Sequence, residues 1–366
     1  MKIAIFINTP AQLHFYKNMI RSFKNRNSKV FLLVRDYGET LQLLSEMDFE
    51  YYIFSRSPKS KSGKIINLPF DIFKAYRYLR NLKPDLVLGF GVYDVFTSHL
   101  LKVPCIVFND SEPNVNNISY AIQYKLYTPF IDLMITPASF KKYFGSKQVR
   151  INSYKELSYL HPNYYLPSDD ITDLLGIKRN ESYTILRFNS FDAVHDFNVK
   201  GFSNEDKIKL VKSLEKYAKV FISSEAEVSS SLKKYVANFP KNRIHDILYH
   251  ANLLVTDTQT MATEGAILGT PTIRCNTFAG NKDMSNFIEL EQKYNLIFNY
   301  SNPDKAINKA IELIQKQNLK EEWKIKKEKL LKDKIDINAF MIRFIENYPQ
   351  SFEEIKRNPE IQNMFK

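Results

Sequence analysis

The feature that most constrains the fold of this chain is the regular alternation of short apolar runs with longer amphipathic segments. Strands of a parallel sheet are buried on both faces and read as continuous apolar runs, and helices connect them. The alternation therefore predicts βαβ units in a doubly wound α/β fold. The first series has predicted strands at 2–7, 30–34, 51–54, 86–89, 105–108 and 133–136, with predicted helices at 11–26, 38–47, 69–82, 93–101, 117–127 and 138–144.

A second series follows a loop-like stretch at 155–168, so two such domains are expected in tandem. Its predicted strands are 183–187, 220–223, 253–256, 272–274 and 296–298, and its predicted helices are 203–217, 228–237, 258–268, 283–292 and 303–317. We expect an N-terminal domain at 1–165, a C-terminal domain at 166–334, and a helix and loose polar tail at 335–366 that pack back on the N-terminal domain. Ligands in such sheets bind beyond the carboxyl ends of the strands, which points to a cleft between the domains.

Composition excludes several other classes of protein. The chain has 366 residues, of which 44% are hydrophobic and 25% charged, as in a globular protein with a large core. Two cysteines, Cys105 and Cys275, cannot build a disulfide framework or a cysteine-based zinc site, and no apolar run is long enough to cross a membrane. The P-loop, Gly-x-Gly-x-x-Gly and Gly-x-Ser-x-Gly motifs are missing from the sequence. These features favour a cytoplasmic protein that is neither a P-loop NTPase nor an α/β-hydrolase.

The net charge of +12 is concentrated in the N-terminal half of the chain. Residues 1–165 contain 22 Lys and Arg against 12 Asp and Glu. Such an excess suits phosphorylated small molecules or an anionic membrane surface, although a lysine-rich genome would also produce it. Nucleic acid is not an expected partner because no known reading module is present. In the helix predicted at 69–82, Ile72, Phe73, Tyr76 and Leu79 form a stripe that we expect in the core, with a membrane-facing surface as the alternative.

The strongest local motif lies around the predicted strand at 253–256 and the helix that follows it. The strand ends at Asp257, Thr258-Gln259-Thr260 opens the helix, and Gly269 closes it. Free amides at a helix start bind phosphate, and Glu264 lies one turn beyond Thr260, where its carboxylate could accept hydrogen bonds from ribose hydroxyls. Ordinary helix capping is the alternative interpretation.

This segment resembles the nucleotide-sugar half-site of GT-B enzymes, a fold shared by many glycosyltransferases and the UDP-N-acetylglucosamine 2-epimerases. In those enzymes an Asp-Ser-Gly-Gly or Asp-Ser-Gly-Thr turn holds the diphosphate and a following Glu holds the ribose. Glu264 matches that Glu, whereas Gln259 replaces the glycine of the turn. No Asp-x-Asp motif of metal-dependent GT-A transferases occurs, so no metal site is expected.

Over nearly its whole length, the chain resembles a prokaryotic family of unknown function related to those enzymes. The resemblance rests on 8–15, 34–40, 108–112 and 187–196, which read NTPAQLHF, VRDYGET, FNDSE and RFNSFDAVHD. It implies two Rossmann-like domains that face a central cleft. It also implies a nucleotide sugar, UDP-linked, as the substrate, with no separate cofactor.

Four polar residues in the first half are candidates for acceptor chemistry. Asn8 and His14 lie in the loop and helix start that follow the first strand, where His14 could act as a general base toward an acceptor hydroxyl. Asp110 and Glu112 follow another strand and could act as acid or base, or bind sugar hydroxyls. A surface histidine and a simple turn are the alternatives.

Four residues in the second half are candidates for the diphosphate. His195 and Arg187 offer positive partners to a departing nucleoside diphosphate, and Asp196 could orient their loop. Arg274 follows a strand and could add charge near the phosphates. His14, Asp110 and His195 are thus the predicted catalytic residues.

The leading hypothesis is a glycosyltransferase of surface polysaccharide or glycolipid synthesis. Its C-terminal domain would bind the donor, and its N-terminal domain would bind a glycan or a lipid-linked acceptor. A peripheral contact with the inner face of the membrane is a further possibility. A 2-epimerase or hydrolase is the alternative, although Val92 and Ala121 stand where two catalytic carboxylates of the epimerases would be expected, unless a shifted alignment lets Asp94 substitute. A noncatalytic nucleotide-sugar-binding protein is the third class.

Overall fold

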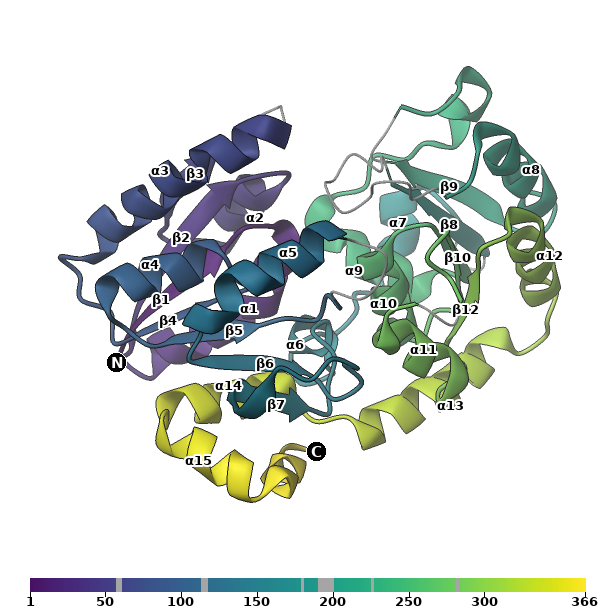
Figure 1. The fold of residues 1–366 in the computed structure, drawn as a ribbon. Helices are drawn as coiled ribbons and strands as arrows, with labels where there is room; N and C mark the ends of the chain where they lie inside the picture. Colours follow the sequence, from purple (N-terminus) through teal and green to yellow (C-terminus); the bar gives the residue numbers. More distant parts are fainter. Residues whose placement is uncertain (57–60, 113–117, 179–180, 190–200, 225–226, 281–282) are drawn as a thin grey trace. The chain divides into compact units, whose positions relative to one another are not determined.

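The computed structural model of the chain describes residues 1–56, 61–112, 118–178, 181–189, 201–224, 227–280 and 283–366. These residues form two compact units, coloured along the sequence in Figure 1. Unit 1 consists of Met1–Tyr159 and Lys334–Lys366, and unit 2 of Leu160–Asp333. Each unit has its own parallel sheet, so the predicted α/β fold class is confirmed.

Unit 1 is built on a seven-stranded parallel sheet with the order β3-β2-β1-β4-β5-β6-β7. The inner strand β1 pairs with both β2 and β4, so Ile5 lies opposite Leu32 on one side and Leu88 on the other. The strands are β1 (Lys2–Ile7), β2 (Lys29–Asp36), β3 (Tyr52–Arg56), β4 (Leu86–Gly89), β5 (Cys105–Phe108), β6 (Leu133–Pro137) and β7 (Gln148–Ile151).

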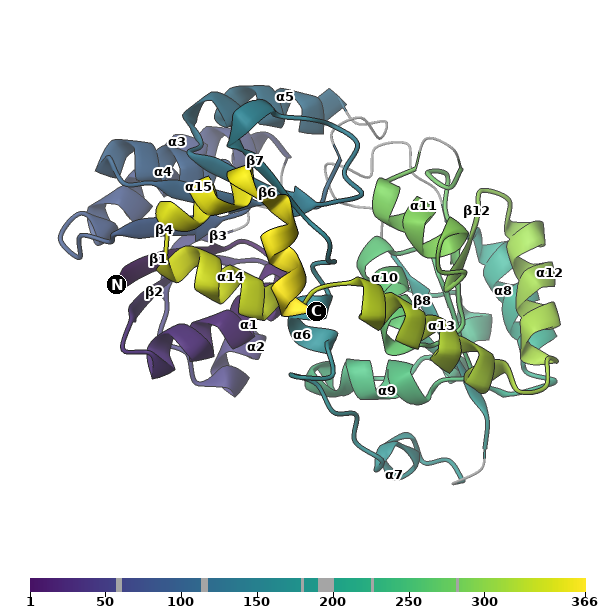
Figure 2. The same cartoon turned by 90° about the horizontal axis from the view of Figure 1, so that it is seen from below.

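Helices cover both faces of this sheet. In Figures 1 and 2, α3, α4 and α5 lie on one face, and α1, α2 and α14 lie on the other. The strand residues alternate accordingly, with Ala4 and Phe6 of β1 in the core beneath α3 and α4. The helices are α1 (Pro10–Asn25), α2 (Thr40–Met47), α3 (Lys61–Leu79), α4 (Tyr93–Leu101), α5 (Ile118–Tyr127), α6 (Leu157–Leu160), α14 (Ile337–Glu346) and α15 (Gln350–Arg357).

Unit 2 contains a five-stranded parallel sheet with the order β12-β11-β10-β8-β9. Helices α8 and α12 lie together on one face, whereas α9, α10, α11 and α13 lie on the other (Figure 1). The strands are β8 (Tyr183–Phe188), β9 (Lys219–Ser224), β10 (Leu253–Thr256), β11 (Thr272–Cys275) and β12 (Ile297–Tyr300). The helices are α7 (Ile171–Leu175), α8 (Asn204–Leu214), α9 (Ile244–His250), α10 (Gln259–Leu268), α11 (Ser285–Gln292), α12 (Pro303–Ile314) and α13 (Leu319–Asp333).

Local sequence explains where several helices begin. The Thr9 hydroxyl accepts from the backbone N–H of Gln12 at 3.3 Å and Pro10 occupies the first turn, so α1 starts directly after β1. In α8, Ser203 and Asp206 form a reciprocal capping box. Both helices therefore begin close to where the sequence places them.

The helix predicted at 138–144 is absent, and this prediction is wrong. The segment forms turns instead, because side chains from elsewhere satisfy its backbone N–H groups. The N–H of Lys141 donates to Glu112 Oε1 at 2.6 Å, and that of Phe144 donates to Gln148 Oε1 at 2.8 Å. The strand β7 that follows was not predicted.

The polar tail is ordered rather than loose. It forms α15 and the 3-10 helix η6 (Pro359–Phe365). The carbonyl of Phe365 accepts from the N–H of Asp336 at 2.7 Å, and Gln362 Oε1 accepts from the N–H of Asn152 at 2.7 Å. Among the described residues, no helix is both long and apolar enough to cross a membrane.

Candidate functional site

The order of the strands in unit 2 puts a topological switch point between β8 and β10. The chain leaves β8 toward α8 on one face of the sheet and leaves β10 toward α10 on the other. Connections that diverge in this way open a space at the carboxyl ends of the two strands, which is where doubly wound sheets bind ligands. The predicted Asp257–Glu264 motif lies at this point.

The start of α10 has no side-chain cap. Thr258 occupies the N-cap position with an extended backbone, but its hydroxyl lies 2.8 Å from the hydroxyl of Thr256. Gln259 and Thr260 are the first helical residues and are half-buried, and the first turn contains no acid. The amides of this turn and the positive end of the helix dipole therefore suit an anion.

Asp257 joins the ends of β8 and β10. Its Oδ1 accepts from the N–H of Asn189 at 2.7 Å, and its backbone carbonyl accepts from Asn276 Nδ2 at 3.2 Å. The chain returns close to this carboxylate at Gly201, where a Cβ would lie 2.3 Å from Asp257 Oδ2. A glycine is needed here because any side chain would collide with Asp257.

Glu264 is buried one turn into α10. Its Oε1 lies 3.1 Å from Nε2 of His245, which comes from α9, and both side chains are more than nine-tenths buried. From the sequence alone we expect His245 to be structural or exposed, and α9 is not among the predicted helices. The contact with His245 therefore fixes the direction of the Glu264 carboxylate.

Arg274 lies at the carboxyl end of β11, beside β10. Its side chain is fully buried, where Nη2 donates to Asp283 and Nε donates to Asn299 Oδ1 at 2.9 Å. Nη1 is also buried and has no hydrogen-bond partner among the residues that the structure describes. The guanidinium is therefore held inside unit 2 by Asp283 and Asn299, and it does not reach the surface where a ligand would bind.

Of the remaining predicted residues of this half, the structure describes Arg187 only. Arg187 ends up on β8, where its Nη1 donates to the hydroxyl of Ser223 at 2.8 Å on β9. His195 and Asp196 lie outside the described residues.

In unit 1 the corresponding switch point lies between β1 and β4; Asn8 follows β1 directly, and His14 lies in the second turn of α1. The N–H of Asn8 donates to Gln12 Oε1 at 2.8 Å, whereas its Oδ1 is buried without a hydrogen-bond partner in the described part of the chain. The ring of His14 is half-buried on α1 and lies 5.2 Å from the ring of Tyr159. The backbone of Asn8 is therefore held by Gln12, and the ring of His14 contacts that of Tyr159.

Asp110 and Glu112 are engaged by protein groups after β5. Asp110 Oδ2 lies 2.6 Å from Lys155 Nζ, and Lys155 is also 3.4 Å from Glu156. These two acids raise the pKa of Lys155 against the effect of its burial. Glu112 is buried and caps the turn at Lys141, so it shapes the edge of the sheet.

The loop after β4 is strained and is held by Asp94. Val92 has φ 61° and ψ −80°, a conformation that a β-branched residue rarely adopts. Both carboxylate oxygens of the fully buried Asp94 accept from the N–H of Gly91, at 3.1 and 3.0 Å. The hydrogen bonds from Gly91 to Asp94 thus hold the loop in place. Strained backbone of this kind is typical of functional sites.

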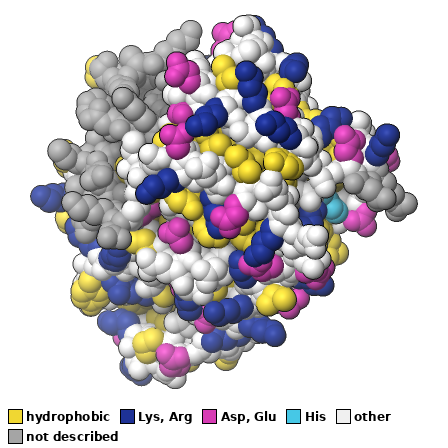
Figure 3. Space-filling model, turned by 90° about the vertical axis from the view of Figure 1, so that its right-hand side faces the viewer, with side chains coloured by type: hydrophobic (Ala, Val, Ile, Leu, Met, Phe, Trp, Pro, Cys, Tyr) yellow, Lys and Arg dark blue, Asp and Glu magenta, His cyan; other side chains and the backbone are white. Residues whose placement is uncertain are grey.

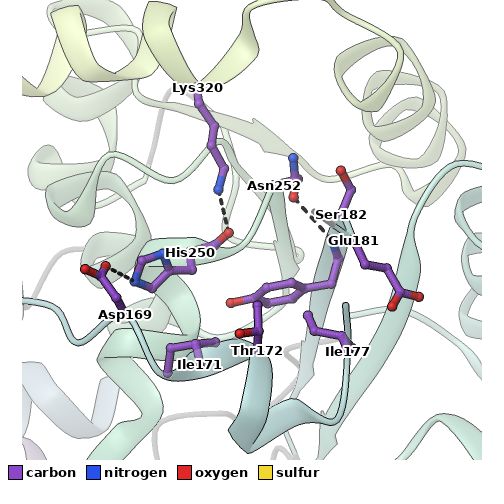
Figure 4. Close-up of a pocket in the computed structure, with 10 residues that line it drawn as sticks. Asp169, Ile171, Thr172, Ile177, Glu181, Ser182, His250, Asn252 and Lys320 are labelled. Atoms are coloured by element: carbon purple, nitrogen blue, oxygen red, sulfur yellow. Dashed lines mark hydrogen bonds and ion pairs between the residues drawn. The ribbon is translucent and has the colours of Figure 1, made fainter. Parts of the chain in front are cut away.

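A hollow of about 230 Å³ lies at the opposite, amino-terminal edge of the unit 2 sheet (Figure 4). In Figure 4, Lys320 Nζ donates to the carbonyl of His250 at 2.6 Å, and Asn252 Oδ1 accepts from the N–H that begins β8 at 3.2 Å. Asp169 Oδ1 lies 3.8 Å from His250 Nε2. Its polar groups bond to the chain itself, so this hollow does not compete with the β8–β10 edge as a candidate site.

The chain belongs to a family described as a protein of unknown function (DUF354), whose model matches residues 1–348. An uncharacterized protein of Methanocaldococcus jannaschii is 21% identical over 294 residues, which cover 75% of this chain and 82% of the relative. The sequence-based assignment to a GT-B-like family of unknown function is thus confirmed.

Solved structures share the fold over almost the whole chain. A Staphylococcus aureus MnaA–UDP co-structure matches with a TM-score of 0.68 and 11% identity, covering 96% of this chain and 98% of that one. A UDP-N-acetylglucosamine 2-epimerase from Rickettsia bellii matches with a TM-score of 0.64 and 15% identity, with 98% of each chain covered. The Streptomyces sp. SF2575 glycosyltransferase SsfS6, complexed with thymidine diphosphate, matches with a TM-score of 0.59 and 12% identity over 94% and 99% of the chains. The fold is therefore of the GT-B type.

Proposed function

We propose that this member of the DUF354 family binds a nucleoside diphosphate sugar, UDP-linked, at the β8–β10 edge of unit 2 and transfers its sugar to an acceptor hydroxyl. The observation that carries the proposal is the uncapped start of α10 with a buried carboxylate, Glu264, one turn behind it. An anion-binding helix start and a fixed acceptor of hydroxyl hydrogen bonds match the diphosphate and the ribose of one ligand. The similar structures that carry UDP and thymidine diphosphate support the same ligand class.

In this proposal the groups around α10 stabilise the departing diphosphate. The amides at Gln259 and Thr260 face the negative charge that grows as the glycosidic bond breaks. The positive charges predicted for Arg187, Arg274 and His195 would add to this effect. Donors fixed before the reaction need no rearrangement as charge develops, which favours the transition state.

The acceptor is proposed to bind at the carboxyl edge of β1 in unit 1. His14 would take the proton of the acceptor hydroxyl, and the buried Oδ1 of Asn8 would accept a hydrogen bond from the sugar or the acceptor. Asp110 is a second candidate base whose Oδ2 is held by Lys155. We propose a glycan or lipid-linked molecule of the cell surface as the acceptor.

A 2-epimerase is the alternative reaction because the similar structures include such enzymes. Two features of unit 1 disfavour it. Val92 has no ionisable group, and Asp94, the nearest carboxylate in sequence, is fully buried and bound to the N–H of Gly91. A carboxylate in that position cannot reach a substrate without the loop unfolding around it.

Calorimetric binding to UDP and to a panel of UDP- and dTDP-linked sugars tests the nucleotide site. We expect Glu264→Gln to weaken binding of the preferred nucleotide by at least about tenfold, because a charge-assisted hydrogen bond to the ribose is lost. Glu312→Gln on α12 is the matched control, since Glu312 lies on the opposite face of the sheet and is exposed. Equal affinity of wild type and Glu264→Gln would disprove the assignment of Glu264.

Product analysis separates the two reactions. Release of nucleotide that depends on an added acceptor supports transfer, and an epimerised donor formed without acceptor supports the alternative. We expect His14→Ala to lower kcat by about 100-fold or more while leaving nucleotide affinity unchanged, as the loss of a general base predicts. Binding of nucleotide with no turnover under either condition would contradict both reactions and favour a noncatalytic role.

A further inference from the structure

The outer side of α3 is apolar although another side of the same helix already packs on the sheet. Ile72 and Leu79 are buried beneath the helix, as the sequence predicts. Phe73, predicted to share their stripe, is exposed instead. Three exposed apolar side chains repeat at helical spacing on one face of α3. They are Ile66, Phe70 and Phe73, with 65%, 73% and 55% of their surface accessible. An exposed apolar face of this kind marks an interaction surface.

Basic side chains lie directly beside these aromatic rings. Lys74 and Arg77 are exposed on α3 and line a hollow of about 460 Å³ together with Phe70 and Phe73. The rest of the lining comes from Tyr52 and Tyr78, whose rings stack at 4.0 Å between centroids. Lys74 Nζ lies 5.6 Å from the centre of the Tyr52 ring. The hollow is thus lined by two basic side chains, Lys74 and Arg77, and by aromatic rings.

Acids are few around this surface. Asp71 is the acid on α3, and it accepts from the Ser55 hydroxyl at 2.6 Å, a contact that turns it toward β3. Glu50 lies near enough to raise the pKa of Tyr78, after the larger effect of burial. The described part of the α3 surface therefore has an excess of positive charge.

The apolar surface continues on the neighbouring helices of the same face of the sheet (Figures 1 and 2). Leu100 at the end of α4 is 50% exposed, and Ile122 and Leu126 on α5 are 53% and 57% exposed. Phe130, in the 3-10 helix η1 (Thr128–Phe130), is 41% exposed. α5 contains no acid, and its Lys125 is exposed. Each of the helices α3, α4 and α5 thus has exposed apolar side chains, and α3 and α5 also have exposed basic ones.

We infer that this surface of α3, α4 and α5, here called the α3–α5 surface, docks unit 1 on an anionic phospholipid bilayer. Aromatic and aliphatic side chains enter the boundary between headgroups and acyl chains, and Lys and Arg bind the lipid phosphates. Charge complementarity favours an anionic bilayer over a neutral one. The α8 and α12 side of unit 2, seen in Figure 3, instead mixes Lys and Arg with Asp and Glu. Docking would bring the acceptor edge of unit 1 to lipid-linked acceptors, but it does not depend on the proposed function.

Co-sedimentation of the full chain with vesicles, in the absence of any nucleotide, tests the inference. We expect binding to vesicles of phosphatidylcholine mixed with phosphatidylglycerol, and far weaker binding to phosphatidylcholine alone. Added salt should reduce the binding, since part of it is electrostatic. Equal binding to both kinds of vesicle, or to neither, would overturn the inference.

Two pairs of substitutions with matched controls locate the surface. Phe70→Ser with Phe73→Ser should weaken binding by at least about tenfold, because two inserted rings are lost. The control, Ile325→Ser, removes a 67% exposed side chain from α13 in unit 2 and should bind like wild type. If the double variant and the control bind equally, another part of the chain holds the membrane and the inference fails.

Charge reversal provides the second pair. Lys74→Glu with Arg77→Glu should weaken binding to anionic vesicles by at least about tenfold, since two basic residues that attract the anionic surface are replaced by acids that it repels. Lys212→Glu with Lys216→Glu on unit 2 changes the net charge equally and should have a smaller effect. Circular dichroism checks that each variant is folded. A concentration-dependent dimer that Phe70→Ser with Phe73→Ser abolishes, without vesicle binding in wild type, would assign the surface to a second copy of the chain instead.

Discussion

At the scale of single residues, Asp94 shows how a buried carboxyl group supports a strained loop. Burial raises the pKa of Asp94 to about 6 from an ordinary value of 3.8, although hydrogen bonds from the backbone at Gly91 oppose the change. Between these two values the folded protein keeps a proton that the unfolded chain releases. The free energy of unfolding of unit 1 should therefore fall as the pH rises from about 4 to 6.

Asp94→Asn should remove this part of the pH dependence. The amide is uncharged at every pH, yet it keeps an oxygen that can accept from Gly91. Because the pKa of Asp94 is raised by about 2 on folding, we expect the variant to gain on the order of 3 kcal/mol relative to wild type between pH 4 and pH 6.5. Urea unfolding followed by far-UV circular dichroism at several pH values measures it. Parallel pH profiles for the two proteins would show that Asp94 does not titrate in this range.

Individual candidate residues could be located from the sequence only in part. Glu264 was identifiable because its spacing from Asp257 is a local pattern, and the structure places it beside the start of α10. Its partner His245 was not identifiable, since the two meet through α9, which lies 19 residues away along the chain. The exposure of Phe73 was missed because helical periodicity cannot distinguish a buried apolar face from an exposed one.

At the scale of secondary-structure elements, the position of α10 depends on Gly265. A Cβ at this residue would lie 2.5 Å from Thr272 Oγ1 and 2.8 Å from Leu254 Cδ2, which are buried on β11 and β10. The glycine therefore lets α10 pack closely on the sheet and sets where its first turn points. Because glycine has a poor helical propensity, close packing and not propensity explains why a glycine stands at this position of α10.

Gly265→Ala should push α10 away from the sheet. We expect a loss of about 1–3 kcal/mol in the stability of unit 2, typical of overpacked cores, and weaker UDP binding. Gly176→Ala is the control: its Cβ would meet no atom within 4 Å, so it suffers only from its φ of 60° and should leave UDP binding unchanged. Unfolding and calorimetric titration measure both effects. An equal change of UDP affinity in the two variants would refute the packing argument.

The elements were predictable to different degrees for physical reasons. The strands of the two sheet centres were recoverable because burial on both faces makes them continuous apolar runs, as in β1 and β10. The edge strand β7 is short and partly exposed, so its sequence lacks that signal. The absent helix at 138–144 has helix-forming residues, but Glu112, which lies 29 residues earlier in the chain, binds the amide of Lys141, and the nearby Gln148 binds that of Phe144. The contact from Glu112 cannot be read from local propensity.

At the scale of the whole molecule, the chain crosses between the two units twice. Lys334–Lys366 belongs to unit 1 although it follows unit 2 in sequence. Ile335 donates its N–H to the carbonyl of Asn152 at 3.0 Å and accepts from the Ser153 hydroxyl at 2.9 Å, so the returning segment is tied to the segment after β7. From the sequence we expect a helix there that packs on the N-terminal domain, but periodicity does not identify the residues that make the contact.

The single tryptophan makes the two units separately observable. Trp323 is fully buried on α13 in unit 2, and its indole N–H donates to the carbonyl of Leu296 at 2.8 Å. Its fluorescence should therefore report the unfolding of unit 2, whereas far-UV circular dichroism reports both units. Each unit has its own sheet and core, so we expect them to unfold in separate transitions.

UDP should raise the unfolding temperature of unit 2, which fluorescence reports, and leave the unfolding temperature of unit 1 unchanged. At a free concentration of 100 times Kd, a ligand that binds only folded unit 2 adds about 2.7 kcal/mol to its stability. The pH effect of Asp94 should in turn be absent from the fluorescence transition, because Asp94 belongs to unit 1. Thermal unfolding followed by both signals, with and without UDP, measures this. If both signals shift by the same amount and the transitions stay separate, the nucleotide also binds unit 1, which would contradict a donor site confined to unit 2. If the two signals follow one common transition, the units unfold together, which would contradict the expected separate unfolding.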